Sequence, residues 1–304
     1  MEKAEAFYEE ILVFTKDVMD KAASGDEGAI DGGFIAGKTR EFCEVIRGNI
    51  DPNDLVRLVF QHDEYEDNYL YCHSVNVCLL CARVALELNY SAGVMQELVI
   101  AALFHDIGMF KVDTGIWNTK GRLSAEDYTE VQKHPAFGEE LFKKIQEAGE
   151  VVPAVIGQHQ ERVDGSGYPR HLKKDNMHYM SRFLSLIDDY VAMTHTRLWR
   201  KRYLPDEAIQ LILDNESNKY DPHFLKELLR TISVFPVGAW VRISSGEFGR
   251  VIITNRDVPM RPVVEVLYDR RGHKLEVPRN MDLSKQLLVH VDNCVDPDAL
   301  QKSM

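Results

Sequence analysis

Histidine and aspartate side chains recur in the middle of the sequence at positions that helical spacing assigns to buried faces. Burying a titratable group without a partner is costly, and a metal ion is an efficient partner for several such groups at once. One histidine on an apolar face is more often a hydrogen-bonded core residue than a ligand. Several of them on one set of helices favour a metal site. The candidates are His73, His105, Asp106, His134, His159 and Asp188.

The adjacent pair His105-Asp106 in "HDIG" carries the most chemical information. A carboxylate has two oxygens and can bridge two cations, while the neighbouring imidazole binds one of them through a ring nitrogen. Mixed imidazole and carboxylate ligands suit iron, manganese or zinc, and the lack of a plausible thiolate ligand disfavours a structural zinc site. Cys78-x-x-Cys81 lies within an apolar helical stretch, where core packing is the better interpretation.

Apolar residues at helical spacing predict the elements that must position these side chains. A helix with its N-cap at Ser91 leads by steps of three and four from Val94 to His105. The same steps lead to the histidine of "VVPAVIGQH", and steps of four lead from Met180 to Asp188. In "VQKHPAF" a proline beside the histidine should kink or stop the helix that begins in "SAEDY".

The stretch "ERVDGSGYP" follows His159 closely and must contain a turn, because glycine allows positive φ and proline fixes its own φ. A histidine at a helix end, beside charged groups held in a rigid turn, suits a metal or phosphate site. On this fragment alone, an ordinary surface loop is the better interpretation.

Composition and charge limit the class of protein. With 304 residues, of which 45% are hydrophobic and 28% charged, the chain suits a soluble globular protein of one large or two ordinary domains. The net charge of −12 argues against DNA or RNA binding. The N-terminus is acidic, and no apolar run approaches the roughly 20 residues that a membrane span needs. Five irregularly spaced cysteines fit reduced thiols. We therefore expect a cytoplasmic protein without membrane contact.

The pattern along the chain predicts a mostly α-helical protein in three parts. Residues 1–60 form an N-terminal helical segment that serves packing or dimerisation, which makes a homodimer one expectation. Residues 61–234 form a bundle of largely buried helices. Residues 235–304 contain short β-rich runs, "AWVRISS", "GRVIITN", "PVVEVLYD", "KLEVP" and "LLVHV", which predict a small β-barrel or β-sandwich module.

The motifs "HDIG" and "ERVDGSGYP" resemble the HD-GYP family, a bacterial group of HD-domain metal-dependent phosphohydrolases. Further stretches match this family in the same order, namely "DNYLYCHSVNV", "KGRLSAEDY", "KHPAFGEELF", "IDDYVAMT" and "YDPHFLKELL". The resemblance extends from about Asp67 to about Ser233. The segment beginning "FPVGAWVRI" also resembles a β module that often follows such domains. The match over so long a stretch implies an all-helical HD domain.

The resemblance also implies an activity, the hydrolysis of the bacterial second messenger cyclic di-GMP at a two- or three-metal centre. Two divalent ions, iron or manganese, would activate a water and neutralise charge on the phosphodiester, with His105 and Asp106 as the catalytic pair. The matched positions assign one metal to His73, His105, Asp106 and Asp188, and the second to Asp106, His134 and His159. The residues implied on the substrate side are Arg162, Gly167, Tyr168 and Arg197.

Several positions depart from the family pattern. Met109 stands where the family has a lysine near the scissile phosphate, and Lys111 is turned roughly 200° away on a helix. The second of the family's paired histidines is Gln160, which is at best a weak metal ligand. Val191 replaces an acid, and Tyr69 stands where three-metal members have a glutamate. A third metal is therefore not expected.

These departures leave three functions open. The first is a working cyclic di-GMP phosphodiesterase with an unconventional two-metal site. The second is a catalytically degenerate module that binds cyclic di-GMP or other signalling proteins, with the "GYP" loop as the protein contact. The third is a phosphohydrolase of another nucleotide, including a different cyclic dinucleotide. Metal content separates the first two, because two firmly bound ions favour the enzyme.

Overall fold

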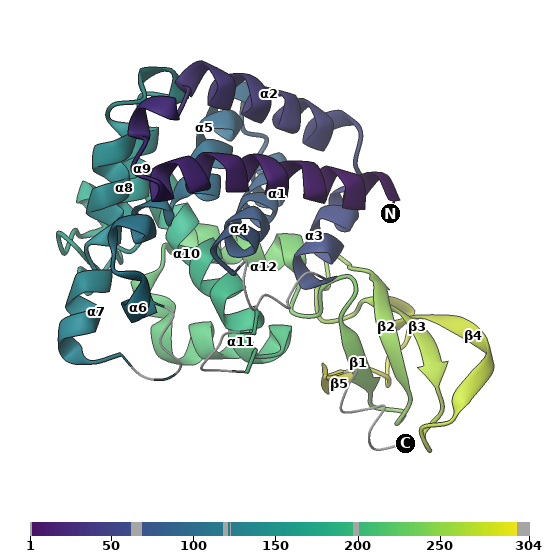
Figure 1. Cartoon of the computed structure of the whole chain (residues 1–304). Coiled ribbons are helices and arrows are strands. Elements are labelled where there is room, and N and C mark those ends of the chain that lie inside the picture. The colour runs from purple at the N-terminus through teal and green to yellow at the C-terminus, as the bar shows by residue number, and fades with distance from the viewer. Residues whose placement is uncertain (1, 62–68, 118–120, 122, 197–200, 297–304) are drawn as a thin grey trace. The chain divides into compact units, whose positions relative to one another are not determined.

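The computed structural model describes residues 2–61, 69–117, 121, 123–196 and 201–296 (Figure 1). The chain divides into two compact units, one of Met1–Lys201 with Ser217–Phe224 and one of Arg202–Glu216 with Leu225–Met304. The first unit is helical and the second contains the strands, so the predicted fold class is confirmed. The part boundaries expected at residues 60 and 234 stay predictions.

Helices that follow one another through short turns build the first unit. Its longer helices are α1 (Glu2–Ala23), α2 (Gly32–Gly48), α3 (Pro52–Gln61), α4 (Tyr69–Glu87), α5 (Ala92–Phe104), α6 (Thr114–Trp117), α7 (Ala125–Val131), α8 (His134–Phe142), α9 (Val152–Gln158) and α10 (Tyr179–Thr194). Single turns between or after them are η1 (Glu27–Ala29), η2 (Ile107–Lys111), η3 (Gln146–Ala148), η4 (Lys174–Asn176) and η6 (Ser217–Lys219). Helix α12 (Pro222–Ile232) begins in this unit.

Helices α4 and α5 form the core of the first unit. Helix α4 packs against α1, α3, α5 and α10, and α5 packs against α2 and α9. By length and composition, Tyr69–Glu87 and Ala92–Lys111 could cross a membrane, which corrects the expectation that no apolar stretch reaches that length. The apolar windows of these helices are 83% and 67% buried inside the unit, and a central position in a folded core requires the same composition.

The cysteines contribute to packing. Cys43, Cys72, Cys78, Cys81 and Cys294 are free thiols and all are buried. Burial raises the pKa of Cys78 and Cys81 well above the ordinary value of a thiol, so both stay protonated. The prediction that these two residues of α4 pack in the core is confirmed.

Local sequence signals set several helix ends. Ser91 caps α5 by accepting a hydrogen bond from the Val94 N–H, and Ser124 caps α7 in the same way. Helix α7 ends at Val131, and α8 begins at His134 with Pro135 in its first turn. The predicted break at the proline is therefore confirmed, because proline lacks the N–H that an interior helical position requires.

A glycine permits the closest approach of backbones near the histidines. A Cβ atom placed on Gly108, in η2, would lie 2.0 Å from the backbone oxygen of His134 and 2.7 Å from the backbone nitrogen of Gly138. These atoms belong to the first turns of α8 and cannot move aside as a flexible side chain could. Glycine at residue 108 therefore sets the spacing between η2, which follows Asp106, and α8, which carries His134.

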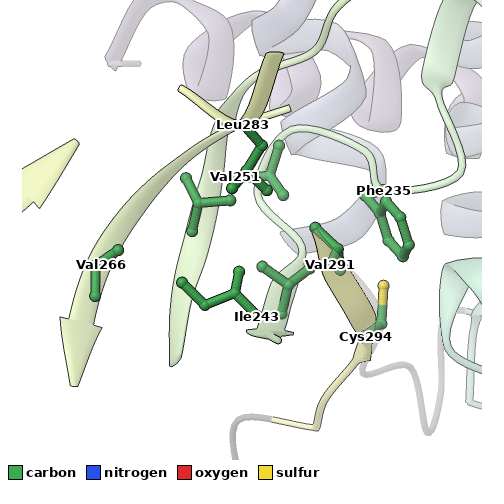
Figure 2. Close-up of a cluster of buried hydrophobic side chains, with 9 residues drawn as sticks. Phe235, Ile243, Val251, Val266, Leu283, Val291 and Cys294 are labelled. Atoms are coloured by element: carbon green, nitrogen blue, oxygen red, sulfur yellow. The ribbon is translucent and has the colours of Figure 1, made fainter. Parts of the chain in front are cut away.

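The second unit contains α11 (Pro205–Leu211), a π-helical turn η5 (Ile212–Glu216), the rest of α12 and an antiparallel sheet. The strands are β1 (Trp240–Ile243), β2 (Phe248–Ile253), β3 (Val263–Tyr268), β4 (Lys274–Asp282) and β5 (Val291–Cys294), in the order β4-β3-β2-β1-β5, with the turn η7 (Leu283–Lys285) after β4. Alternate residues of β1 to β3 point into one core (Figure 2), whose buried members are Phe235, Val241, Ile243, Val251, Val264, Val266, Leu283, Val291 and Cys294.

The turns and the last strand show where strand prediction succeeded and failed. Gly246 and Gly272 adopt positive φ in the turns after β1 and β3, which glycine does without strain. The last strand was expected in "LLVHV", but it covers Val291–Cys294. Leu287 and Leu288 are 91% and 90% exposed. An apolar run therefore misled the prediction, because these two leucines do not contribute to the core.

The first prediction concerns Gly108. We expect Gly108→Ala to lower the free energy of unfolding by at least about 2 kcal/mol, because the added methyl group meets the backbone of the first turn of α8. The matched control is Gly93→Ala in α5, where no atom lies within 4 Å of the added Cβ and alanine favours the helix by up to about 1 kcal/mol. Thermal or denaturant unfolding measures both. Equal stability of the two variants would contradict the close packing of η2 on α8.

Candidate metal centre

Six titratable side chains from six separate helices and turns converge inside the first unit. They lie mostly at helix ends: His105 directly follows α5, Asp106 precedes η2, His134 opens α8 and His159 follows α9. The other two lie within α4 and α10. Three overlapping groups have ligand atoms within 4.8 Å of one another, namely His73 with His105 and Asp106, His105 with His159 and Asp188, and Asp106 with His134 and His159. The structure thus brings together all six predicted ligands.

One half of the centre surrounds Asp188. The His73 Nε2 lies 2.8 Å from Asp188 Oδ1. The His105 Nε2 lies 3.6 Å from the same oxygen and 3.4 Å from Asp106 Oδ2. His73, His105 and Asp188 are therefore neighbours. Together with Asp106, they are the ligands predicted for the first metal.

The other half surrounds the second oxygen of Asp106. The His134 Nε2 lies 3.2 Å from Asp106 Oδ1, and the His159 Nε2 lies 3.5 Å from it. The two carboxylate oxygens of Asp106 thus face different histidines, with Oδ2 toward His105 and Oδ1 toward the other pair. This is the orientation that a carboxylate bridging two cations requires.

Backbone carbonyl groups fix the tautomer of three imidazole rings, that is, which ring nitrogen carries the proton. The Nδ1 atoms of His105, His134 and His159 lie 2.7 or 2.8 Å from the carbonyl oxygens of Ala102, Val131 and Ile156. Each Nδ1 must carry a proton to donate to its carbonyl, so in a neutral ring each Nε2 holds a lone pair. These are the nitrogen atoms that face Asp106.

The contacts among these lone pairs are favourable only with a cation. The Nε2 atoms of His134 and His159 lie 3.1 Å apart, although both rings have already used their proton at Nδ1. Within the described residues, the buried Nε2 of His105 has no hydrogen-bond partner. Two acceptors that face each other repel unless a proton or metal ion lies between them. The donor set therefore fits divalent metal ions that accept imidazole and carboxylate ligands.

The electrostatics of the two carboxylates agree with this arrangement. Burial alone would raise the pKa of Asp106, but His105, His134 and His159 lower it well below the ordinary value. The pKa of Asp188 is likewise well below its ordinary value, because His105 and His73 outweigh the effect of burial. Both groups are therefore carboxylates at neutral pH, which is the form that binds metals.

The residues that replace the family's lysine and glutamate make contacts of another kind. The Tyr69 ring stacks on the His73 ring with centroids 5.4 Å apart and planes 12° apart. Met109 is buried in an apolar cluster with Leu70 and Val112. These two positions thus supply packing around the ligands.

Lys111, the nearest lysine along the chain, has a partner away from the ligands. Its Nζ lies 2.8 Å from Glu27 Oε1, and the Lys144 Nζ lies 2.8 Å from the other oxygen of Glu27. These two lysines lower the pKa of Glu27 to about 2. This ion pair agrees with the expectation that Lys111 is a poor substitute for the missing lysine.

Gln160 and Arg162 continue the site toward the "GYP" loop. The Gln160 Nε2 donates to Asp188 Oδ2 at 2.9 Å, so its amide contacts a predicted ligand. The Arg162 guanidinium forms an ion pair with Asp189 Oδ2 at 2.6 Å and lies 5.9 Å from the centre of the Tyr220 ring. The pKa of Arg162 is raised because Asp189 outweighs the effect of burial. The metal-binding role of Gln160 stays a prediction.

The loop itself is held against the residues that follow His159. The buried Glu161 carboxylate accepts hydrogen bonds from the backbone N–H groups of Arg170, at 2.7 Å, and Leu172, at 2.9 Å. Gly167 lies so close to the backbone that follows His159 that a Cβ on it would be 2.4 Å from the backbone nitrogen of Arg162. The backbone N–H of Tyr168 donates a hydrogen bond to the backbone carbonyl oxygen of Gln160 at 3.1 Å. These contacts fix the loop beside the candidate ligands.

Some residues of the site were not predicted, and one predicted residue cannot be placed. Sequence analysis missed Asp189, the partner of Arg162, and Glu161, which holds the loop. Both are acids next to a predicted residue in a quoted motif, and this adjacency was the available signal. Arg197, predicted to meet a phosphate, lies outside the described residues.

Family models match both parts of the chain. The model of the HD domain matches residues 60–224, and the model of the KOW domain associated with the HD domain matches residues 240–303. Among similar proteins is the cyclic di-GMP phosphodiesterase PA4108 of Pseudomonas aeruginosa, 31% identical over 230 residues, which cover 76% of this chain and 55% of the relative. Another is the 3'3'-cGAMP-specific phosphodiesterase 3 of Vibrio cholerae, 29% identical over 168 residues, which cover 55% of this chain and 36% of the relative. The chain thus spans about half or less of these relatives.

A solved structure has a similar fold. It is Bd1817, a HDG"Y"P protein from Bdellovibrio bacteriovorus, with a TM-score of 0.58 and 19% sequence identity, covering 72% of this chain and 69% of that one. The match of the HD model to more than half of the chain, the named relatives and this likeness of fold agree with the motifs around His105 and Tyr168. The chain therefore belongs to the HD-domain family and is of the HD-GYP type.

Proposed function

We propose that the chain is a metal-dependent phosphodiesterase that hydrolyses cyclic di-GMP at a centre of two divalent ions. The observation that carries this proposal is the orientation of Asp106, whose two oxygens face two different sets of histidines. A bridging carboxylate of this kind is what a two-metal site for phosphodiester hydrolysis requires. The names of the relatives support cyclic di-GMP as the substrate.

Each ligand has a proposed place. His73, His105, Asp106 and Asp188 hold one ion, and Asp106, His134 and His159 hold the other. Imidazole and carboxylate ligands suit iron or manganese. When bound, two such ions supply an activated water and neutralise charge on the phosphodiester. Three-metal members of the family have a glutamate where this chain has Tyr69, whose ring stacks on His73. Residue 69 therefore supplies no carboxylate for a third ion, which supports two ions over three.

The surrounding residues orient the ligands and border the substrate. Gln160 holds Asp188 through its amide, so the two carboxylate oxygens of Asp188 have distinct partners. Arg162, Gly167 and Tyr168 lie on the loop that borders the site and are proposed to contact the nucleotide. The ion pair with Asp189 keeps the Arg162 guanidinium in place. Partner proteins that contact this loop remain a proposal as well.

A binding module without turnover is the second candidate function. Met109 packs among apolar side chains where the family has a lysine, and Lys111 is paired with Glu27. The Gln160 amide donates to Asp188 and adds no imidazole to the second ligand set. Loss of a phosphate lysine and a metal histidine is compatible with a receptor for cyclic di-GMP that retains the enzyme fold.

A different cyclic dinucleotide is the third candidate substrate. Three similar proteins of Vibrio cholerae are named 3'3'-cGAMP-specific phosphodiesterases, which supports this alternative. We also propose that the protein acts in the cytoplasm, where free thiols such as its buried cysteines stay reduced.

Asp106 provides the test of the proposed activity. We expect Asp106→Asn to lose at least one bound ion and to lower cyclic di-GMP hydrolysis at least about 100-fold, because loss of a group that merely orients a ligand already costs 10- to 100-fold. Metal content and turnover are measured on the same sample, purified without air and without chelator. Asp175→Asn, at an exposed acid in η4, is the control. Unchanged metal content and turnover in Asp106→Asn would exclude the proposed centre.

Gln160 provides a test that separates the enzyme from the binding module. We expect Gln160→His to bind the second ion more tightly and to raise turnover, since imidazole is a much better ligand than an amide. Gln160→Ala removes the bond to Asp188 without adding a ligand and should not raise either quantity. Met109→Lys is a companion variant. Because it places a charge at a buried position, we expect it also to lower the free energy of unfolding, so unfolding is measured in parallel. Tight binding of two ions by Gln160→His without any turnover would favour the binding module.

A further inference from the structure

An exposed tyrosine outside the predicted site lies beside the "GYP" loop. Tyr128, on α7, has 49% of its surface exposed, and its ring centroid lies 6.4 Å from that of Tyr168 with planes 77° apart. The Tyr168 ring in turn lies 6.2 Å from the His134 ring, with planes 78° apart. Three rings therefore lead from a proposed metal ligand to the solvent.

The two tyrosines stand in a fixed relation because both backbones are held. Helix α7 begins at the Ser124 cap, and the Tyr128 N–H bonds to the Ser124 carbonyl oxygen at 2.9 Å. The Tyr168 N–H bonds to the Gln160 oxygen at 3.1 Å. The Tyr168 ring is the inner one, and burial, Tyr128 and Asp106 all raise its pKa. The nearly perpendicular rings form a corner, so a flat group on one ring meets the edge of the other.

The charge of α7 indicates which part of a nucleotide fits there. Glu130 of α7 forms an ion pair with Lys133, which leaves the carboxylates of Glu126 and Asp127 on the same short helix as Tyr128. These carboxylates would repel a phosphate, whereas an uncharged purine can stack on a tyrosine ring. The phosphodiester is placed by the proposed metal centre, on the inner side of His134.

We propose that Tyr128, together with Tyr168, forms a stacking site for a purine base of the nucleotide substrate. The inference rests on the proposed function, because it places the scissile phosphodiester at Asp106. It gives a role to Tyr128, the last residue of the matched stretch "KGRLSAEDY", which was not among the predicted ligands or substrate-binding residues. Tyr128 is a binding residue in this account and takes no part in bond cleavage.

Two phosphate compounds that differ in the base alone test the proposal. Guanosine 5'-monophosphate and ribose 5-phosphate share the sugar and the phosphate, so both can reach the metal centre. Binding of each to metal-loaded wild type, Tyr128→Ala and Tyr128→Phe is measured by titration calorimetry, and unfolding confirms that the variants are folded. We expect Tyr128→Ala to bind guanosine 5'-monophosphate roughly tenfold more weakly than wild type and ribose 5-phosphate with the same affinity. Tyr128→Phe should bind both compounds as wild type does, because the ring supplies the stacking.

The outcomes separate this inference from the proposed hydrolysis. Equal affinity of wild type and Tyr128→Ala for the guanosine compound overturns the stacking site, as does an equal loss for both compounds. If cyclic di-GMP is not hydrolysed by wild type but the base-dependent loss is seen, the stacking site stands and the hydrolase does not. If wild type binds neither compound, both the stacking site and the phosphate site are overturned.

Discussion

The burial of two carboxylates against four imidazole rings is the constraint on which the first unit depends. Asp106 and Asp188 are anionic, and the nitrogen atoms that face them are acceptors wherever Nδ1 holds the proton. Such a cluster is costly in a protein interior unless a cation compensates it. The helices around it therefore bring together groups that become favourable neighbours when a proton or a metal ion lies between them, and we expect folding of this region to be coupled to metal binding.

The way in which the histidines are oriented explains why they lie at helix ends. Ala102, Val131 and Ile156 lie in the last turns of α5, α7 and α9, where carbonyl groups have no partner within the helix. In each case the histidine three residues later donates its Nδ1–H to that carbonyl. One hydrogen bond thus satisfies a carbonyl, fixes the ring and turns Nε2 toward Asp106. Gly108 then allows η2 and α8 to approach closely.

The sequence predicted the helical class and the six candidate ligands because helical periodicity and short motifs are local patterns, whereas the assignment of those ligands to two metals came from the resemblance to the HD-GYP family. His105 ends an apolar helical face, and the proline after His134 marks a helix start. Contacts between distant segments could not be read in the same way. The ion pair of Arg162 with Asp189, the pair of Lys111 with Glu27 and the approach of Tyr128 to Tyr168 depend on how separate elements pack. The last strand was misplaced because an apolar run can be exposed.

The most direct measurement is anomalous X-ray diffraction from crystals of the metal-loaded protein. We expect two ions, both within about 2.0–2.6 Å of Asp106, one beside His105 and the other beside His134 and His159. This result would establish Asp106 as the bridge between two metals. A single ion, or two ions of which only one contacts Asp106, would exclude Asp106 as a bridge between two metals.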